Sequence, residues 1–238
     1  MYRRIIFLTL FCLVIAIQVH CQKKINVLFL GNSLTYSNNL PELVKKVAAC
    51  DSVEITYQSI SFPNYALVDH WDDGNAQQEI KSGKYNFVIV QQGPSSQTEG
   101  RTYLLDYGLK FDSICDQNNA KIVSYMVWPS KARSEDFPGV FESYKLLAEA
   151  AHGIFCPAGN AWLQVWASNP NFKLYDEDNF HPSYRGSLLA AMVIYGSIMQ
   201  KQNLTFVQYE KLKTPQLTKP DFKILVRAAQ RVLTHKKR

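Results

Sequence analysis

The sequence predicts an α/β protein of three layers, α/β/α, in which helices cover both faces of a central parallel sheet of about five strands. One observation is a set of short runs that are apolar or β-branched throughout, at 25–30, 53–60, 87–90 and 122–127, with a weaker run at 153–156. The other is that stretches of helical period separate these runs. Strands without polar alternation are buried on both faces, and their alternation with helices is typical of parallel sheets.

The helices are expected between the strands and after the last one. Their ranges are 40–49, 67–81, 103–118, 137–152 and 182–200, and a final amphipathic helix starts at Pro220. Pro41 suits the first turn of its helix, where a missing N–H costs nothing. No internal repeat or linker interrupts the pattern, so residues 22–238 are predicted to form a single domain.

Residues 1–21 predict a secretory signal peptide. Arg3 and Arg4 form a basic start, and the apolar stretch 5–19 that follows is too short for a comfortable membrane span. Cleavage before Gln22 would give a periplasmic or secreted bacterial protein, exported through the Sec route, with no stable membrane anchor. The alternative is a retained anchor, or a lipoprotein acylated at Cys21.

Charge and cysteine content exclude some classes of function. The formal net charge is +6, and removal of Arg3 and Arg4 leaves 24 basic against 20 acidic residues. Part of this surplus lies in the tail 236–238, and no basic cluster elsewhere indicates a nucleic-acid partner. Three cysteines follow the signal, at positions 50, 115 and 156, an odd number without metal-binding spacing. Three buried thiols are the simpler expectation, with one disulfide as the alternative.

The ends of the predicted strands select candidate site residues. In open parallel sheets, ligands bind beyond the carboxyl ends of the strands. Gly31-Asn32-Ser33 follows the first strand, Phe62-Pro63-Asn64 the second, Gln91-Gln92-Gly93 the third and Trp128-Pro129 the fourth.

Ser33 is a candidate nucleophile, and a serine hydroxyl needs a base that a carboxylate orients. His181 is the best placed histidine, because it lies in the irregular polar segment YDEDNFHPSYRG directly before a helix that begins with Pro182. Asp178 is three residues earlier, close enough to reach the imidazole within one loop. Each motif alone is weak, because Gly-x-Ser is usually a turn and Asp-x-x-His is usually a surface pair.

Together the two motifs resemble the first and last conserved blocks of the SGNH/GDSL hydrolases. These blocks stand here as Gly31-Asn32-Ser33-Leu34-Thr35 and Asp178-Asn179-Phe180-His181, in the expected order at the two ends of the domain. The resemblance covers roughly residues 25–199 and is strongest to the exported bacterial esterases. It implies a flavodoxin-like three-layer fold and a Ser33-His181-Asp178 triad.

The two middle blocks depart from the family pattern. The resemblance implies an oxyanion hole made by the backbone N–H groups of Ser33 and Asn64 and by a glutamine amide. Gln91-Gln92-Gly93 looks similar to the Gln-Gly pattern of sialate O-acetylesterases and acetylxylan esterases, which favours Gln92 as the donor. Gln91 remains the alternative, because successive residues of a strand face opposite ways.

The resemblance implies hydrolysis of an ester through an acyl-enzyme, without a metal or cofactor. The expected substrate is a small-molecule or glycan ester, most of all an O-acetyl group on a carbohydrate; the oligomeric state is left open. One rival is a glycan-binding relative that lacks activity. Another is a metal-dependent phosphoesterase that uses Asp178, His181 and His70, against which the sequence offers no further ligand cluster.

Overall fold

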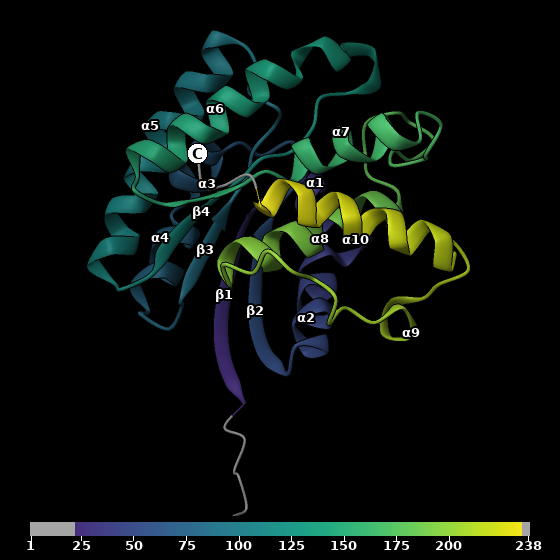
Figure 1. Ribbon diagram of the computed structural model, residues 1–238. Helices are drawn as coiled ribbons and strands as arrows, with labels where there is room; N and C mark the ends of the chain where they lie inside the picture. Colours follow the sequence, from purple (N-terminus) through teal and green to yellow (C-terminus); the bar gives the residue numbers. More distant parts are fainter. Residues whose placement is uncertain (1–21, 235–238) are drawn as a thin grey trace, which may run out of the picture.

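The computed structural model describes residues 22–234, and their strands form one parallel sheet (Figure 1). The strands are β1 (Lys23–Gly31), β2 (Val53–Ser61), β3 (Phe87–Val90), β4 (Lys121–Tyr125) and β5 (Ile154–Cys156). Their order across the sheet is β2-β1-β3-β4-β5, with every neighbouring pair parallel. The predicted parallel sheet of five strands is confirmed.

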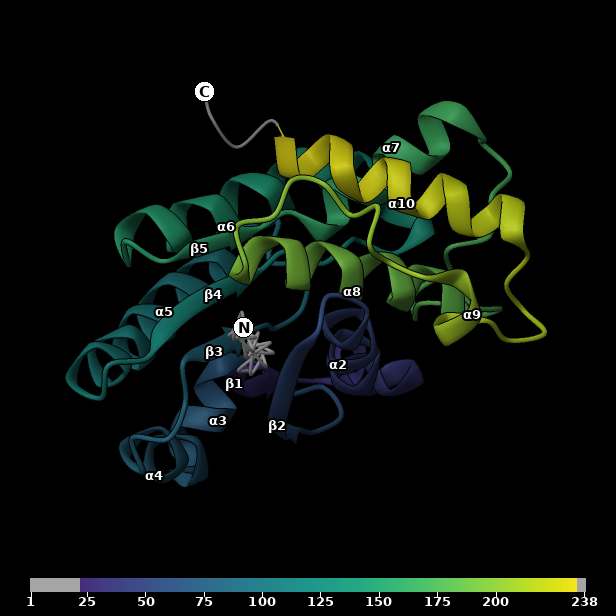
Figure 2. The ribbon, with the colours of Figure 1, turned by 60° about the horizontal axis from the view of Figure 1, so that its bottom comes forward.

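Helices cover both faces of this sheet, so the predicted three layers are also confirmed (Figures 1 and 2). On one face, α2 (Leu40–Cys50) and α8 (Tyr184–Ile198) pack on each other and on the sheet, and α10 (Lys219–Thr234) lies across α8 and α7 (Ala158–Ser168). The other face carries α3 (Leu67–Asp73), α5 (Thr98–Gln117) and α6 (Phe137–Ala150). Shorter elements complete the chain: α1 (Ser33–Tyr36), η1 (Ser37–Asn39), α4 (Asn75–Lys81), η2 (Lys131–Asp136) and α9 (Tyr209–Leu212).

The helix expected over 67–81 is in fact two helices. Gly74 separates α3 from α4 with φ of 77°, a left-handed conformation that ends the first helix. Glycine adopts this conformation without steric cost, and it is the usual residue after a helix end.

The helix α7 was not predicted. Its sequence AGNAWLQVWAS contains a glycine and two tryptophans, which are weaker helix formers than alanine or leucine. Packing explains the glycine, since a Cβ on Gly159 would lie 2.2 Å from the Val127 carbonyl oxygen. The buried stripe of Ala158, Ala161, Trp162 and Val165 has helical spacing, and tertiary contacts along it outweigh the weak propensity.

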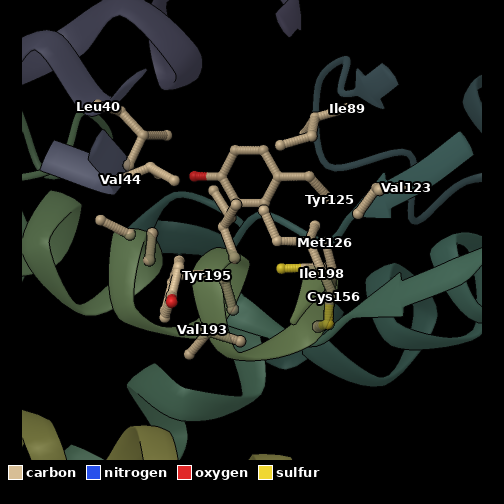
Figure 3. Packing of buried hydrophobic residues seen from close by; sticks show 14 of the residues in the cluster. Leu40, Val44, Ile89, Val123, Tyr125, Met126, Cys156, Val193, Tyr195 and Ile198 are labelled. Carbon is tan, nitrogen blue, oxygen red and sulfur yellow. The ribbon is translucent and has the colours of Figure 1, made fainter. Parts of the chain in front are cut away.

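The core joins the sheet to α2 and α8. Figure 3 shows the ring of Tyr125, the last residue of β4, between the side chains of Leu40 and Val44 from α2 and those of α8. All of these side chains are buried. Because this packing fixes both helices against the sheet, it also fixes the segments just before them, which contain Ser33 and His181.

The described cysteines lie in the protein interior. Cys50, Cys115 and Cys156 are buried, and no disulfide joins them, in agreement with the expectation of three thiols. Burial raises the pKa of Cys115 to about 12, so that thiol stays protonated and unreactive.

The predicted signal peptide, residues 1–21, lies outside the described residues. Within 22–234, no helix is both long enough and apolar enough to cross a membrane.

Candidate active site

The turn after β1 presents Ser33 as the first residue of α1. Asn32 caps this helix, with its Oδ1 accepting from Leu34 N at 3.1 Å. Gly31 is required by close packing, because a Cβ there would lie 2.3 Å from Thr35 Oγ1. The Gly-Asn-Ser-Leu-Thr run therefore builds a tight strand-to-helix turn that directs the serine hydroxyl outward.

Ser33, His181 and Asp178 form a continuous hydrogen-bonded chain. His181 Nε2 lies 2.8 Å from Ser33 Oγ, and His181 Nδ1 lies 2.5 Å from Asp178 Oδ2. The other oxygen of Asp178 accepts from the backbone N–H groups of Phe180 and His181, both at 2.9 Å. One carboxylate therefore shapes the loop and orients the imidazole at the same time.

These hydrogen bonds keep Asp178 ionised. The bond from His181 lowers the pKa of the Asp178 carboxyl below its ordinary value, and the two backbone N–H groups add to this effect. An ionised Asp178 holds the imidazole hydrogen on Nδ1, which leaves the Nε2 lone pair for the Ser33 proton. The arrangement is suited to activating the hydroxyl as a nucleophile.

The loop that carries His181 is fastened at several points. Trp128 Nε1 donates to the Phe180 carbonyl at 3.1 Å, and the Lys131 N–H donates to the Asn179 carbonyl at 2.9 Å. On the other side, Asn38 Nδ2 donates to the Pro182 carbonyl at 2.8 Å. Trp128 is itself stacked on Trp162 of α7, with ring centroids 3.6 Å apart. The helix that the sequence analysis missed thus supports the histidine loop.

A second loop, after β2, lies against the Ser33 turn. Phe62 N donates to the Gly31 carbonyl at 3.2 Å, and Asn32 Nδ2 donates to the Tyr65 carbonyl at 3.0 Å. Between these contacts, Asn64 has φ of 62°, the left-handed conformation that asparagine tolerates better than most residues. Among the hydrogen bonds of residues 22–234, none uses the backbone N–H of Ser33 or of Asn64, so both remain available for an oxyanion.

Gln91 is buried and stabilises the Ser33 turn through hydrogen bonds. Its Oε1 accepts from Asn32 N at 3.1 Å and from Thr35 Oγ1 at 2.7 Å. Its Nε2 donates to Asn32 Oδ1 at 3.0 Å and also to the Gln92 carbonyl.

Gln92 points the other way, as strand alternation requires. Its Oε1 accepts from Leu67 N at 3.1 Å, and its Nε2 donates to Ser95 Oγ at 2.8 Å and to the Gly100 carbonyl at 2.9 Å. The amide hydrogens of both glutamines are used in these contacts. The expectation that Gln92, or else Gln91, supplies a side-chain donor to the oxyanion therefore stays a prediction, which kinetics must decide. The resemblance assigns the donor role to a glutamine, whereas in this structure buried polar neighbours accept from both amides.

We therefore expect Gln91→Ala to lower kcat more than Gln92→Ala does. Loss of Gln91 leaves the buried N–H of Asn32 and the hydroxyl of Thr35 without their acceptor, a destabilisation of roughly 1–3 kcal/mol per group, and loosens the turn that directs Ser33. Loss of Gln92 instead loosens the 93–97 loop and should act mainly on KM. Steady-state kinetics, with unfolding midpoints for both variants, test this ranking; a larger kcat loss in Gln92→Ala would contradict it and support Gln92 as the oxyanion donor.

His70 is a buried part of the site whose role sequence reasoning missed. Its Nε2 lies 2.8 Å from the Gly31 carbonyl oxygen, so the neutral imidazole donates to the last carbonyl before the Ser33 turn. Nothing in the spacing of His70 indicates this contact. Within residues 22–234, no group of three or more His, Cys, Asp or Glu side chains could hold a metal ion, so the structure does not unite His70 with Asp178 and His181 as ligands.

Burial lowers the pKa of His70 below its ordinary value of 6.5, although the hydrogen bond to the Gly31 carbonyl and the charges of Asp69 and Asp73 partly oppose the shift. As the pH falls below about 6.5, the unfolded chain takes up a proton there that the folded chain does not, so stability should fall. His70→Gln keeps an N–H donor and removes this titration. Urea unfolding at pH 7.5 and 5.5 should show that the free energy of unfolding falls less between these pH values in the variant than in wild type. Equal falls in both proteins would contradict the assignment.

No family model matches the sequence, and no curated protein matches it. Several solved structures, however, are similar to this chain. A DUF4886 family protein from Bacteroides uniformis aligns with a TM-score of 0.76 at 13% identity, over 91% of this chain and 97% of its own. A protein from Slackia heliotrinireducens, described as a candidate SGNH hydrolase, aligns with a TM-score of 0.63 at 21% identity, over 74% of this chain and 100% of its own.

A third similar structure is a variant of an acetyl-xylooligosaccharide esterase from Geobacillus. It has a TM-score of 0.52 and 14% identity, over 77% of this chain and 96% of its own. At these identities the likeness concerns the fold. The chain has the fold of the SGNH/GDSL hydrolases, as the blocks around Ser33 and His181 predicted.

Proposed function

We propose that the protein is a serine esterase that works through Ser33, His181 and Asp178. The observation that carries the proposal is the unbroken chain from Ser33 Oγ through both imidazole nitrogens to the Asp178 carboxylate. Nucleophile, base and orienting group within hydrogen-bond distance are what acyl transfer requires. A glycan-binding protein without activity would not require this alignment of hydroxyl, imidazole and carboxylate.

In the first half of the reaction, Ser33 Oγ attacks the ester carbonyl carbon while its proton passes to His181 Nε2. The negative charge that develops on the carbonyl oxygen is stabilised by the Ser33 and Asn64 backbone N–H groups. When the tetrahedral intermediate collapses, the bond to the alcohol oxygen breaks and His181 gives that oxygen its proton. The acyl group remains bonded to Ser33.

In the second half, water attacks the acyl carbon as His181 takes its proton. Collapse then breaks the bond to Ser33 Oγ, which regains a proton from His181, and the carboxylic acid departs. Asp178 remains ionised throughout and stabilises the imidazolium. No other reactant is needed.

We infer that the substrate is an O-acetyl ester of a carbohydrate. One support is the likeness to the acetyl-xylooligosaccharide esterase fold. A second is that the site is open, since the side chains of His181 and Asp178 are 37% and 50% exposed. An open polar site suits a hydrated glycan, whereas a long acyl chain needs an enclosed apolar groove.

Acetate release from acetylated glycans tests this proposal, with 4-nitrophenyl esters of two to eight carbons as comparison substrates. We expect the highest kcat/KM on acetyl esters of sugars and no release by Ser33→Ala. A steady rise of kcat/KM with acyl length would indicate a lipid or thioester substrate instead. Absence of turnover on every ester would contradict the esterase itself.

A further inference from the structure

A hollow of about 290 Å³ lies near the histidine loop, with Phe180 in its wall. Its walls come from three segments: the loop 94–97 after β3, the loop 129–136 after β4, and Phe180. Phe180 directly precedes His181, and the two rings are 5.2 Å apart. The walls follow the carboxyl ends of β3 and β4, so the hollow lies at that edge of the sheet, and Phe180 connects it to the base.

The order of the strands places this hollow on one side of Ser33 and the oxyanion hole on the other. Ser33 follows β1, Asn64 follows the neighbouring β2, and the walls of the hollow follow β3 and β4 on the opposite side of β1. His181 Nε2 must give its proton to the departing alcohol oxygen, so that oxygen leaves on the histidine side. The alcohol portion of an ester is then directed toward the hollow.

The lining has the chemistry of a sugar-binding surface. Pro94, Pro129 and Phe180 supply apolar walls on which the C–H face of a ring can pack. At the polar end, Arg133 Nη2 lies 2.5 Å from Asp136 Oδ2, and the same oxygen accepts from Ser96 Oγ at 3.0 Å.

Several polar atoms of this lining have no partner among the hydrogen bonds of residues 22–234. They are the second oxygen of Asp136, the remaining nitrogens of Arg133, the Ser130 hydroxyl and the Gln97 amide. Donors and acceptors thus stand side by side, which suits hydroxyl groups, because each hydroxyl both donates and accepts.

The loop that forms one wall is built rigidly. Ser95 has φ of 57°, a left-handed conformation that costs a serine free energy. Contacts from three neighbours hold it there: Gln92 Nε2 donates to Ser95 Oγ at 2.8 Å, Ser143 Oγ donates to its carbonyl at 2.6 Å, and Gly100 lets the backbone approach closely. Strain held by surrounding contacts is typical of preorganised sites.

We propose that this hollow binds the sugar ring of the alcohol portion of the substrate, with Arg133 and Asp136 hydrogen-bonding its hydroxyl groups. The proposal rests on the esterase function proposed above and adds the place of the sugar and the residues that select it. The volume of this hollow is near the lower end of the range found for ligand pockets, and it therefore fits a single sugar ring better than a chain of sugars.

Arg133→Gln tests the proposal on two acetyl esters, a monoacetylated methyl glycoside and 4-nitrophenyl acetate. The variant should raise KM for the sugar ester about tenfold with little change in kcat, because a hydrogen bond from a charged group is lost. Its kinetics on 4-nitrophenyl acetate, whose alcohol has no sugar hydroxyls, should stay within about twofold. Lys45→Gln, on the exposed surface of α2, controls for the loss of one positive charge.

Ser130→Trp, which fills the hollow, is the second variant. It should impair hydrolysis of the sugar ester and spare 4-nitrophenyl acetate. Equal effects of Arg133→Gln on both esters, or no effect on either, would overturn the assignment. So would a Ser130→Trp variant that loses only esters of longer acyl chains, because the hollow would then hold the acyl group.

A binding measurement separates this proposal from the esterase proposal. The free methyl glycoside is titrated by NMR into Ser33→Ala, with and without Arg133→Gln. Binding that the second substitution weakens supports the subsite even if no ester is hydrolysed, whereas absence of binding to Ser33→Ala contradicts it. Turnover of 4-nitrophenyl acetate without any binding or hydrolysis of sugar esters would leave the esterase standing and reject the sugar subsite.

Discussion

Ser33→Ala is expected to lower kcat for ester hydrolysis by roughly 10⁴-fold or more while leaving the fold intact. In the proposed mechanism this hydroxyl forms the acyl-enzyme, and within residues 22–234 its only side-chain hydrogen bond is to His181 Nε2. Asn32 and Gln91 hold the turn through their own contacts, so the backbone does not depend on the hydroxyl. Steady-state kinetics and a thermal unfolding curve measure both parts of the prediction.

Ser37→Ala is the matched control. Ser37 lies four residues further along the chain, and its hydroxyl forms no hydrogen bond within residues 22–234. We expect wild-type kinetics from this variant. A Ser33→Ala enzyme within tenfold of wild type would mean that another group is the nucleophile.

Asp178→Asn is expected to lower kcat by roughly 10³- to 10⁴-fold, a loss typical of a triad whose imidazole takes the wrong tautomer. The asparagine oxygen can still accept from the backbone N–H groups of Phe180 and His181, so the loop keeps its shape. Its NH₂ group, however, faces His181 Nδ1 and requires that nitrogen to accept. The imidazole hydrogen then moves to Nε2, where it faces Ser33 Oγ and blocks proton transfer.

Asp176→Asn provides the comparison within the same loop. Asp176 Oδ1 accepts from Glu177 N at 2.9 Å, and its side chain makes no contact with His181 among the described hydrogen bonds. This variant should retain activity within about threefold, because only a surface turn contact changes. Similar losses in both variants would indicate that the loop needs its negative charge, and that Asp178 has no special role.

The strands, and the hydrogen bond between Asp178 and His181, could be predicted because their signals are local. Runs such as 25–30 and 87–90 are apolar throughout, and a parallel sheet is the arrangement that buries both of their faces. Asp178 and His181 lie three residues apart, so one loop brings them together. Only the pairing of that loop with Ser33 is long-range, and the resemblance of two blocks to a known family supplied it.

The roles of the buried polar residues Gln91 and His70 could not be predicted, because their partners are distant in the chain. Gln91 contacts Asn32 and Thr35 more than 50 residues away, and His70 contacts Gly31 across 39 residues. At the end of a strand, a buried amide that fastens a turn and an amide that faces a substrate have the same sequence pattern. Only the packing around each glutamine distinguishes the two roles.

Covalent labelling by a fluorophosphonate tests the central claim most directly. The probe phosphonylates a serine only when a base takes its proton, and therefore reports the Ser33-His181 pair without knowledge of the substrate. Intact-mass spectra should show one adduct per chain, mapped to Ser33 by peptide analysis and absent in Ser33→Ala and His181→Ala. A folded wild-type protein that gains no adduct, or gains it on another serine, would contradict the account.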